Sequence, residues 1–420
     1  MRIKNNISAM IPSSRLYLLS FAVFLILLAL WSQLSDIGKL SGTKYQSIVA
    51  RRRPLKGPNA PPVLAYWILG SGGEKKRMLR LLKAIYHPRN QYLLQLDSSA
   101  PEYERVELVV LLTESEKVMR EFGNVNVVGK SYGVNQMGAS GLGAVLHAAA
   151  LLLRISADWD WFIPLTTSDY PLYTQDDILY ALSPLPRDVN FVGYSNDTTW
   201  NKRQNVGQIV VDPSLYLTEE TPVFYAVETR EKPDAFQIFG GSGWMIVSRG
   251  LLEHCVNGWD NLPRKLLMYF NNVNFPLQSY FQTLLCNTPE FQNTTVNHDL
   301  RYIITQNTDD ADVMKEEYYN IGEAIIARPF REEDPRMQEI DRQRLLNRQE
   351  DRVVAGKWCM ERGVAVNETA GGGGCSNEED LLWSAVWGDI DSVRAASEGI
   401  KLRNILTRIV QQKRLVCGEL

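Results

Sequence analysis

The longest apolar stretch of the chain, residues 16–35, contains no charged side chain. A helix of this length spans roughly 30 Å, which matches the hydrocarbon core of a bilayer. Three basic residues precede the stretch and Asp36 follows it. This charge bias predicts a cytoplasmic tail over residues 1–15, a transmembrane signal anchor, and a lumenal remainder. A cleaved signal peptide is the alternative, and it would also deliver the remainder to the secretory lumen.

After a polar, proline-containing stem over residues 36–60, apolar runs alternate with helical patterns. Strands are predicted at residues 63–69, 92–96, 125–128 and 161–165, and helices at 74–86, 141–154 and from 176 to 182. Residues 108–112 fit a strand, with a helix end as the alternative, and residues 332–352 fit a charged amphipathic helix. Strands alternating with helices indicate one α/β domain over residues 61–420, built on a mainly parallel sheet.

Charge and composition narrow the function classes. The 45 basic and 48 acidic residues leave a net charge of −3, which gives no reason to expect a nucleic-acid partner. The four histidines and five cysteines form neither a Cys-x-x-Cys pair nor a His-Glu-x-x-His motif. A zinc site is therefore not expected.

Two features fit an oxidising lumen. Asn196, Asn293 and Asn367 each begin an Asn-x-Ser/Thr acceptor sequence for glycosylation. All five cysteines lie in the C-terminal half, where disulfides are expected. Cys359 with Cys375 is the predicted pair, because the short loop between them contains a run of four glycines.

Acidic residues at strand ends mark a candidate cleft, because ligands of open α/β sheets bind outside the carboxyl ends of the strands. Asp97 closes one predicted strand and Asp169 follows another. Asp158 and Asp160 form an Asp-x-Asp motif, the pattern that carries a metal in many nucleotide-sugar transferases. They precede their strand, so we expect them at the opposite edge, as structural caps. No divalent metal is expected.

Several segments carry a family resemblance: residues 87–97, 158–172, 209–217, 241–253, 258–270 and 293–300, and Trp358-Cys359. They resemble the core-2/I-branching β-1,6-N-acetylglucosaminyltransferase family, glycosyltransferase family 14, and most of all its plant β-glucuronosyltransferase branch. The similarity covers roughly residues 60 to 420. It implies a GT-A-like fold, a UDP-sugar donor, inversion at the anomeric carbon and no cofactor.

The resemblance also implies roles for individual residues. Asp97 would contact the nucleoside, and Asp169 and Trp244 would line the sugar pocket, although turn caps and a core tryptophan are the structural alternatives. Without a metal, arginine or lysine side chains must stabilise the departing diphosphate, and the candidates are Arg301, Arg328 and Arg331. Lys202 and Arg203 would reach the acceptor, with a solvated loop as the alternative.

The position of the catalytic base departs from the family pattern. Gln278 stands where the plant branch usually has a glutamate, and an amide cannot accept the proton. Asp299 is the next candidate. Two functions follow: an inverting transferase that moves glucuronic acid or a related sugar onto β-galactan or arabinogalactan-type O-glycans of glycoproteins, or a catalytically degenerate member that binds glycan or a partner transferase. Either would reside in the Golgi membrane with its domain in the lumen.

Overall fold

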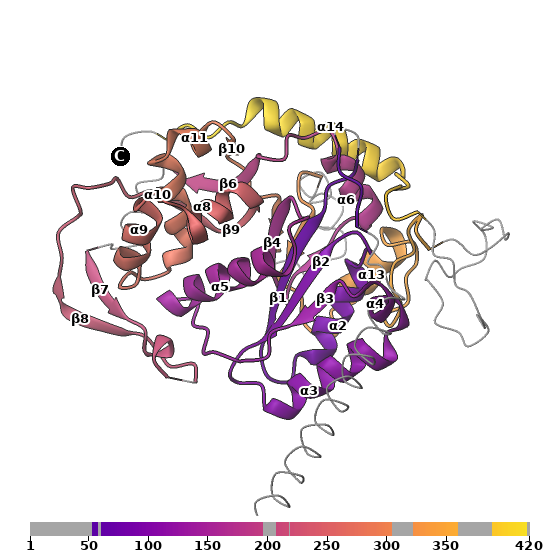
Figure 1. The fold of residues 1–420 in the computed structure, drawn as a ribbon, viewed down its shortest axis with the longest axis horizontal. Coiled ribbons are helices and arrows are strands. Elements are labelled where there is room, and N and C mark those ends of the chain that lie inside the picture. Colours follow the sequence, from indigo (N-terminus) through magenta and orange to yellow (C-terminus); the bar gives the residue numbers. More distant parts are fainter. Residues whose placement is uncertain are drawn as a thin grey trace, which may run out of the picture. The chain divides into compact units, whose positions relative to one another are not determined.

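A seven-stranded, mainly parallel sheet organises the domain in the computed structural model, which describes residues 53–57, 60–195, 207–217, 219–304, 322–359 and 389–417. The strand order is β10-β6-β9-β4-β1-β2-β3 (Figure 1). Only β9 runs antiparallel to its neighbours among these strands. Their bounds are β1 Leu64–Gly70, β2 Gln91–Leu96, β3 Val125–Val127, β4 Trp161–Thr166, β6 Asn190–Ser195, β9 Gly240–Ser248 and β10 Thr295–Val296. The predicted mixed α/β class is confirmed.

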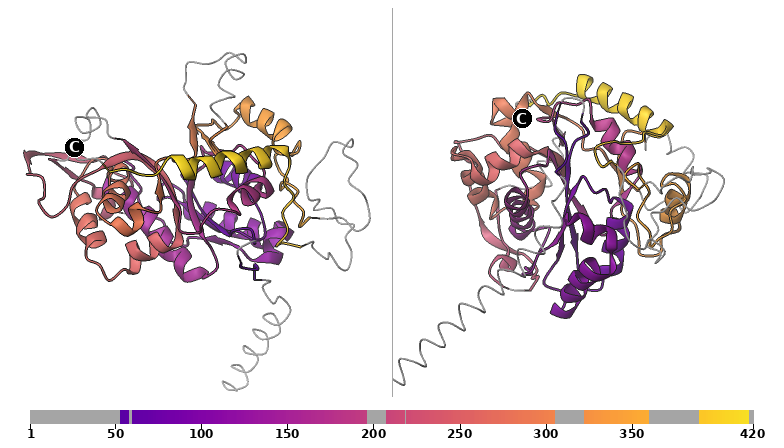
Figure 2. Two further views of the ribbon diagram at one scale, coloured as in Figure 1. Left: turned by 90° about the horizontal axis from the view of Figure 1, so that it is seen from above. Right: turned by 45° about the vertical axis from the view of Figure 1, so that its right-hand side comes forward.

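Side chains of the central strand β1 lie in two separate hydrophobic cores, one on each face of the sheet. Leu64, Tyr66 and Ile68 point into one core, and Ala65 and Trp67 into the other. The first core contains residues of α2 (Lys75–Ala84), α6 (Gln175–Leu182), α13 (Pro335–Gln343) and α14 (Ser397–Gln412). The second contains residues of α5 (Ala139–Ile155), α8 (Arg249–Asn257), α9 (Leu262–Phe270) and α10 (Tyr280–Cys286). The sheet is therefore the middle layer of an α/β/α arrangement (Figure 2).

Two smaller sheets flank the central one. The first has three strands, in the order β11 (Arg301–Ile303), β12 (Ile326–Arg328) and β5 (Tyr170–Pro171). Strands β7 (Gln208–Val211) and β8 (Phe224–Thr229) form an antiparallel hairpin, which lies to the side of the central sheet in Figure 1. The three-stranded sheet positions the candidate site, and the hairpin borders it.

The strand prediction for residues 108–112 is wrong, and its helical alternative is correct. Helix α3 (Glu102–Val110) continues into a π-helical turn, Leu111–Ser115. Glu104 and Leu108, four residues apart, are the buried positions of α3, and the Glu104 carboxylate accepts hydrogen bonds from the Gly73 backbone. The buried positions are therefore spaced as in a helix, although residues 108–112 form an apolar run that also fits a strand.

The helix predicted over residues 332–352 is shorter than expected. The Asp334 side chain caps the start of α13, and the helix ends at Gln343. Leu346 and Asn347 then adopt left-handed backbone conformations, which an α-helix excludes. The turn brings Arg348 back into the core, where its Nε donates to Asp341 Oδ1 at 3.1 Å.

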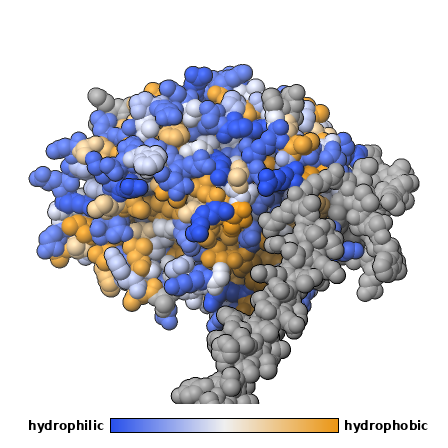
Figure 3. All heavy atoms as spheres, viewed as in Figure 1, coloured by the Kyte–Doolittle hydropathy of each residue, from blue (hydrophilic) through white to orange (hydrophobic). Residues whose placement is uncertain are grey.

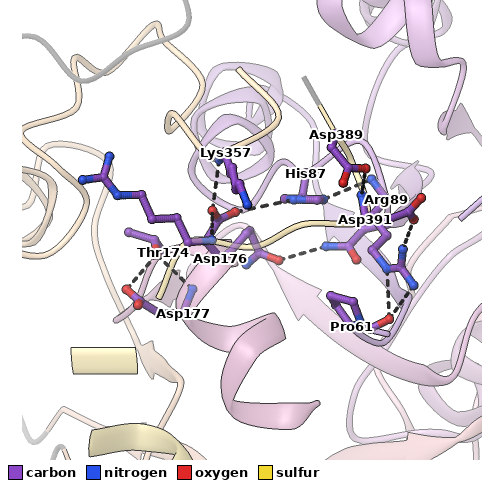
Figure 4. A network of polar contacts seen from close by, with 12 residues as sticks. Pro61, His87, Arg89, Thr174, Asp176, Asp177, Lys357, Asp389 and Asp391 are labelled. Atoms are coloured by element: carbon purple, nitrogen blue, oxygen red, sulfur yellow. Dashed lines mark hydrogen bonds and ion pairs between the residues drawn. The ribbon is translucent and has the colours of Figure 1, made fainter. Parts of the chain in front are cut away.

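A buried polar network attaches later parts of the chain to the start of α6 (Figure 4). Asp176 Oδ2 accepts hydrogen bonds from the backbone N–H groups of Lys357 (3.1 Å) and Arg394 (2.8 Å). Asp177 Oδ1 accepts from the backbone N–H of Ala396 at 2.8 Å. Carboxylates near a helix N-terminus are stabilised by the helix dipole, so these two serve both α6 and the segment that enters α14.

The same region joins the two ends of the domain. Arg89 is almost fully buried, forms an ion pair with Asp391, and donates from Nε to the carbonyl oxygen of Pro61 at 3.0 Å (Figure 4). A buried guanidinium needs such partners, because an unpaired charge in the interior is costly. The start of β1 is thus fixed to residues near α14.

A disulfide in the C-terminal half is confirmed, but it joins a pair that we did not predict, Cys286 and Cys417. Cys359 is also disulfide-bonded, while Cys375 lies outside the described residues, so the Cys359–Cys375 pairing stays a prediction. Cys255 is the free thiol of the described residues, and burial raises its pKa to about 12. It is therefore not a reactive thiolate at neutral pH.

The predicted tail, the predicted anchor and most of the stem lie outside the described residues. Among the helices that are described, none is both long enough and apolar enough to cross a bilayer.

Candidate active site

A cleft opens at the carboxyl ends of β1 and β4, where the sheet topology predicts a ligand site. The empty space between its walls is about 550 Å³, including the part open to solvent. Apolar side chains of β1, β4, β9 and α5 form most of its walls. The polar groups that line it include Asp169, Arg301, Arg328 and Gln136.

Asp169 is the one carboxylate that lines the cleft in the described part of the chain. It is only 2% exposed, and its Oδ2 accepts hydrogen bonds from the N–H and the hydroxyl of Thr166 at 2.6 and 2.8 Å. Its Oδ1 accepts no hydrogen bond from the described residues. Burial raises the pKa of Asp169, although Arg328, Thr166 and Arg301 oppose the shift. The buried, unsatisfied oxygen can accept a hydrogen bond from a ligand.

The three-stranded sheet brings two arginines to this carboxylate. In the antiparallel pairing of β12 with β5, Ala327 lies opposite Tyr170, which places Arg328 beside Asp169. Arg328 Nε lies 3.6 Å from Asp169 Oδ1, an ion-pair distance that is too long for a hydrogen bond. Arg301 comes from the parallel neighbour, β11. Together the three side chains carry a net positive charge when Asp169 is ionised.

Arg301 has the more enclosed guanidinium of the pair. Its Cζ lies 5.2 Å from the centre of the Trp244 ring, within cation–π range. Its Nε is buried and has no hydrogen-bond partner among the described residues. Burial lowers the pKa of Arg301 from its usual value, but a guanidinium stays charged at any physiological pH. This donor is therefore available to an anionic ligand.

Trp244 belongs both to the core and to the cleft, so the two interpretations of its role are not exclusive. It is 4% exposed and packs in the core, yet it also lines the cleft. Its Nε1 donates to the Asp299 carbonyl oxygen at 2.7 Å, which fixes the ring as a rigid wall.

The two candidate bases lie beside the cleft rather than in its lining. Gln278 is half-buried and follows Leu277, which lines the cleft; a methyl group built on Gly243 would lie 3.5 Å from Gln278 Cγ. Asp299 is half-buried behind Trp244, and its Oδ1 accepts from the Arg301 backbone N–H at 3.3 Å. The structure thus brings both candidates near Asp169 and the two arginines.

Asp97 lies at the predicted sheet edge but outside this cleft. Its Oδ2 accepts from the Ser71 hydroxyl at 2.8 Å, and its Oδ1 accepts from the N–H and hydroxyl of Ser99. These are the contacts of an aspartate that caps a turn, which is the structural alternative to a nucleoside contact. Asp97 is 4% exposed.

The remaining predicted site residues divide into two groups. Asn293 is exposed directly after α11 (Pro289–Gln292), so the acceptor site is accessible. Outside the described residues lie Asn196, Lys202, Arg203 and Asn367.

The Asp-x-Asp motif lies at the opposite end of the sheet, as predicted. Asp160 precedes β4, and its Oδ2 accepts from the Val63 backbone N–H at 2.8 Å; Asp158 lies 3.6 Å from the Lys56 ammonium. Among the described residues no group of three or more histidine, cysteine or acidic side chains is arranged to hold a metal ion.

One contact at the site was not predicted: a carboxylate that caps α5 next to the cleft. Asp212, 2% exposed, accepts from the Ser140 backbone N–H at 2.7 Å, so its charge meets the positive end of the helix dipole. Gly138 leaves room for it, because a methyl group there would lie 2.2 Å from Asp212 Oδ2. Asp212 stands in a segment with family resemblance, but its helix partner is 72 residues away.

An α/β/α domain with two arginines and a buried carboxylate at the carboxyl edge of its sheet is the arrangement of an enzyme that binds an anionic substrate. The sequence comparisons define the class further. The family described as Core-2/I-Branching enzyme matches residues 64–327. The chain belongs to this family, and it is a glycosyltransferase.

Its similarity to plant enzymes covers most of the chain. The β-glucuronosyltransferase GlcAT14A of Arabidopsis thaliana is 40% identical over 84% of this chain and 76% of its own length. GlcAT14C of the same plant is 40% identical over 80% of this chain and 87% of its own length. Among solved structures, the galactosyltransferase LgtC, in complex with donor and acceptor sugar analogues, matches with a TM-score of 0.35 at 9% identity, covering 66% of this chain and 94% of LgtC.

Proposed function

We propose that this protein transfers glucuronic acid from UDP-glucuronic acid to β-galactan or arabinogalactan-type O-glycans of glycoproteins. The names of its plant relatives, β-glucuronosyltransferases, support the donor sugar. The observation that carries the proposal is the pair Arg301 and Arg328 in one cleft. UDP-glucuronic acid carries negative charge on its diphosphate and on its sugar carboxylate, and guanidinium groups bind both kinds of oxyanion.

In the proposed reaction an acceptor hydroxyl oxygen attacks the anomeric carbon of the donor from the face opposite the diphosphate. The new carbon–oxygen bond forms as the bond to the diphosphate oxygen breaks, so the configuration inverts and UDP leaves with the bonding electrons. Arg301 and Arg328 stabilise the charge that develops on the leaving group, which is the role of a preorganised electrostatic site. Asp169 accepts a hydrogen bond from a hydroxyl of the donor sugar.

The proton of the acceptor hydroxyl passes to a carboxylate, for which we propose Asp299. It lies beside the cleft wall, and it is half-buried, so an acceptor can reach it. Asp169 is almost fully buried, and in this proposal its Oδ1 binds the donor sugar instead. Gln278 is placed to contact the acceptor but offers no proton acceptor of sufficient basicity.

The proposal includes location and cofactor use. A single apolar span at residues 16–35, with basic residues before it, supports a type II protein of the Golgi membrane with the domain in the lumen. Protease added to sealed microsomes should then leave the domain intact. Digestion of the domain from outside contradicts this topology. No metal is proposed, because the arginines supply the positive charge.

The central test is transfer by the purified full-length protein with a panel of UDP-sugars and β-galactan acceptors. We expect UDP-glucuronic acid to be used at least about tenfold better than UDP-glucose, and EDTA to leave the rate unchanged. Arg301→Gln should lower kcat/KM by about 10²–10³. Transfer of another sugar refutes the donor, and a rate restored only by manganese refutes the metal-free cleft. UDP binding with no transfer of any sugar identifies the degenerate, glycan-binding alternative.

A further inference from the structure

Exposed apolar side chains gather on the β7–β8 hairpin and on the turn between its strands. They are Tyr216, Leu217, Phe224, Tyr225 and Val227, with exposed fractions of 77%, 54%, 60%, 51% and 95%; we call these five residues the hairpin patch. Figure 3 shows hydrophobic residues on the side of the surface where Figure 1 places the hairpin. A group of large exposed apolar side chains in one region of the surface marks a candidate binding site.

The hairpin is fixed to the domain rather than free. Val210 donates from its backbone N–H to the Asn272 carbonyl oxygen at 3.1 Å, and Asn272 Nδ2 donates back to the Val210 carbonyl oxygen at 3.0 Å. At the end of β8, the Arg230 guanidinium stacks on the Tyr269 ring with 3.9 Å between Cζ and the ring centre. The backbone that carries the patch therefore has a defined position on the domain, as a binding site requires.

The turn of the hairpin is also bonded to the rim of the cleft. Asn135 Nδ2 donates to the Thr221 carbonyl oxygen at 3.0 Å, and the neighbours of Asn135 in sequence, Val134 and Gln136, line the cleft. Asp212, just before the turn, holds the start of α5, whose residue Gly141 also lines the cleft. The turn of the hairpin is thus bonded to residues that adjoin the cleft lining in sequence.

We infer that the hairpin patch binds the acceptor glycan beyond the sugar unit that receives glucuronic acid; this inference rests on the proposed function. A galactan acceptor is longer than the cleft, so its remaining units must lie on the surface next to the cleft mouth. Each galactopyranose ring has an apolar face of C–H groups that packs on an aromatic ring, while its hydroxyls stay at the edges. Tyrosine suits such a ligand, since it combines an apolar ring with a hydrogen-bonding hydroxyl.

The charges around the patch favour a neutral ligand. Three exposed glutamates, Glu219, Glu220 and Glu228, border it. A polyanionic glycan or an anionic lipid surface would be repelled by these carboxylates. A neutral galactan chain meets no such repulsion, and its hydroxyls donate hydrogen bonds to carboxylates.

The test compares glycan lengths with the full-length protein. Binding of galactobiose and of a galactohexaose is measured by calorimetry, together with the transfer kinetics of both. We expect Tyr216→Ala with Phe224→Ala to weaken hexaose binding and to raise its KM about tenfold or more, and to leave galactobiose and UDP binding unchanged. Each single variant should lower the hexaose affinity about threefold. Trp259→Ala, which removes a fully exposed aromatic ring outside the patch, is the matched control.

Several results would overturn the inference. These are equal hexaose and galactobiose affinities in the natural protein, no hexaose binding, or an unchanged hexaose affinity in the double variant. A dimer in light scattering that the double variant dissolves, without any change in glycan affinity, assigns the patch to a second copy of the chain instead. Failure of the proposed function is a separate result, because hexaose binding is measured without a donor and without turnover.

Discussion

At the scale of single residues, the cleft is defined by a carboxylate whose ionised form is costly to bury. Burial raises the pKa of Asp169 above that of an unfolded chain, so the ionised group reduces stability at neutral pH. As the pH falls through the raised pKa, the folded state binds a proton before the unfolded state does. The contribution of Asp169 to the free energy of unfolding therefore becomes more favourable as the pH falls.

Asp169→Asn tests this linkage, because the amide keeps the size of the side chain and does not titrate. We expect the difference in Tm, natural protein minus variant, to increase as the pH is lowered from 7 towards 4. Transfer activity of the variant should fall, since one hydrogen-bond acceptor for the donor sugar is weakened. A Tm difference that is constant with pH would contradict the raised pKa.

The catalytic base is a second residue-scale question. Asp299→Asn removes the proposed proton acceptor and should lower kcat by about 10²–10⁴. Gln278→Ala is the matched control at the neighbouring position and should change kcat less than tenfold. Gln278→Glu should raise kcat little, because Asp299 already supplies the proposed proton acceptor. If Asp299→Asn retains full kcat, the base lies elsewhere and Asp169 becomes the first candidate.

At the scale of elements, the long-range pairings of the site are the part that sequence reasoning does not reach. The central strands are predictable, because a parallel strand buried on both faces is a continuous apolar run. In contrast, β11 and β12 have three residues each, too few to show a period. Arg301 and Arg328 were selected by family resemblance and by the need for cations. Only the pairing of β12 with β5 shows that Arg328 lies beside Asp169.

The start of α5 offers a test of one such long-range contact. Gly138→Ala should destabilise the fold by about 1–3 kcal/mol, because the new methyl group displaces the buried carboxylate of Asp212. Asp212→Ala removes the clash, so the double variant should be less destabilised than the sum of the single variants. Gly250→Ala is the matched control, since a methyl group there meets nothing within 4 Å. Additive effects in chemical denaturation would show that the two residues do not meet.

At the scale of the whole molecule, one disulfide closes a very large loop. Cys286 and Cys417 are 131 residues apart in sequence, and cross-links over long loops restrict the unfolded chain most. Replacing both cysteines with serine should lower the free energy of unfolding by about 2–5 kcal/mol. Cys255→Ala retains the disulfide and should lower the free energy of unfolding by less than the double replacement does. Peptide mapping without reduction that finds Cys286 and Cys417 unlinked would contradict the pairing.

The residues before Cys417 complete the sheet at β10. The Leu415 backbone N–H donates to the Thr295 carbonyl oxygen at 2.9 Å, and Val296 pairs with Arg414. During synthesis, these residues leave the ribosome after every strand of the central sheet. An emerging chain therefore keeps one edge of β10 unpaired, and Cys286 lacks its disulfide partner, until residue 417 has left the ribosome. The last edge pairing and the Cys286–Cys417 bridge can therefore close only after every other strand of the central sheet is available for pairing.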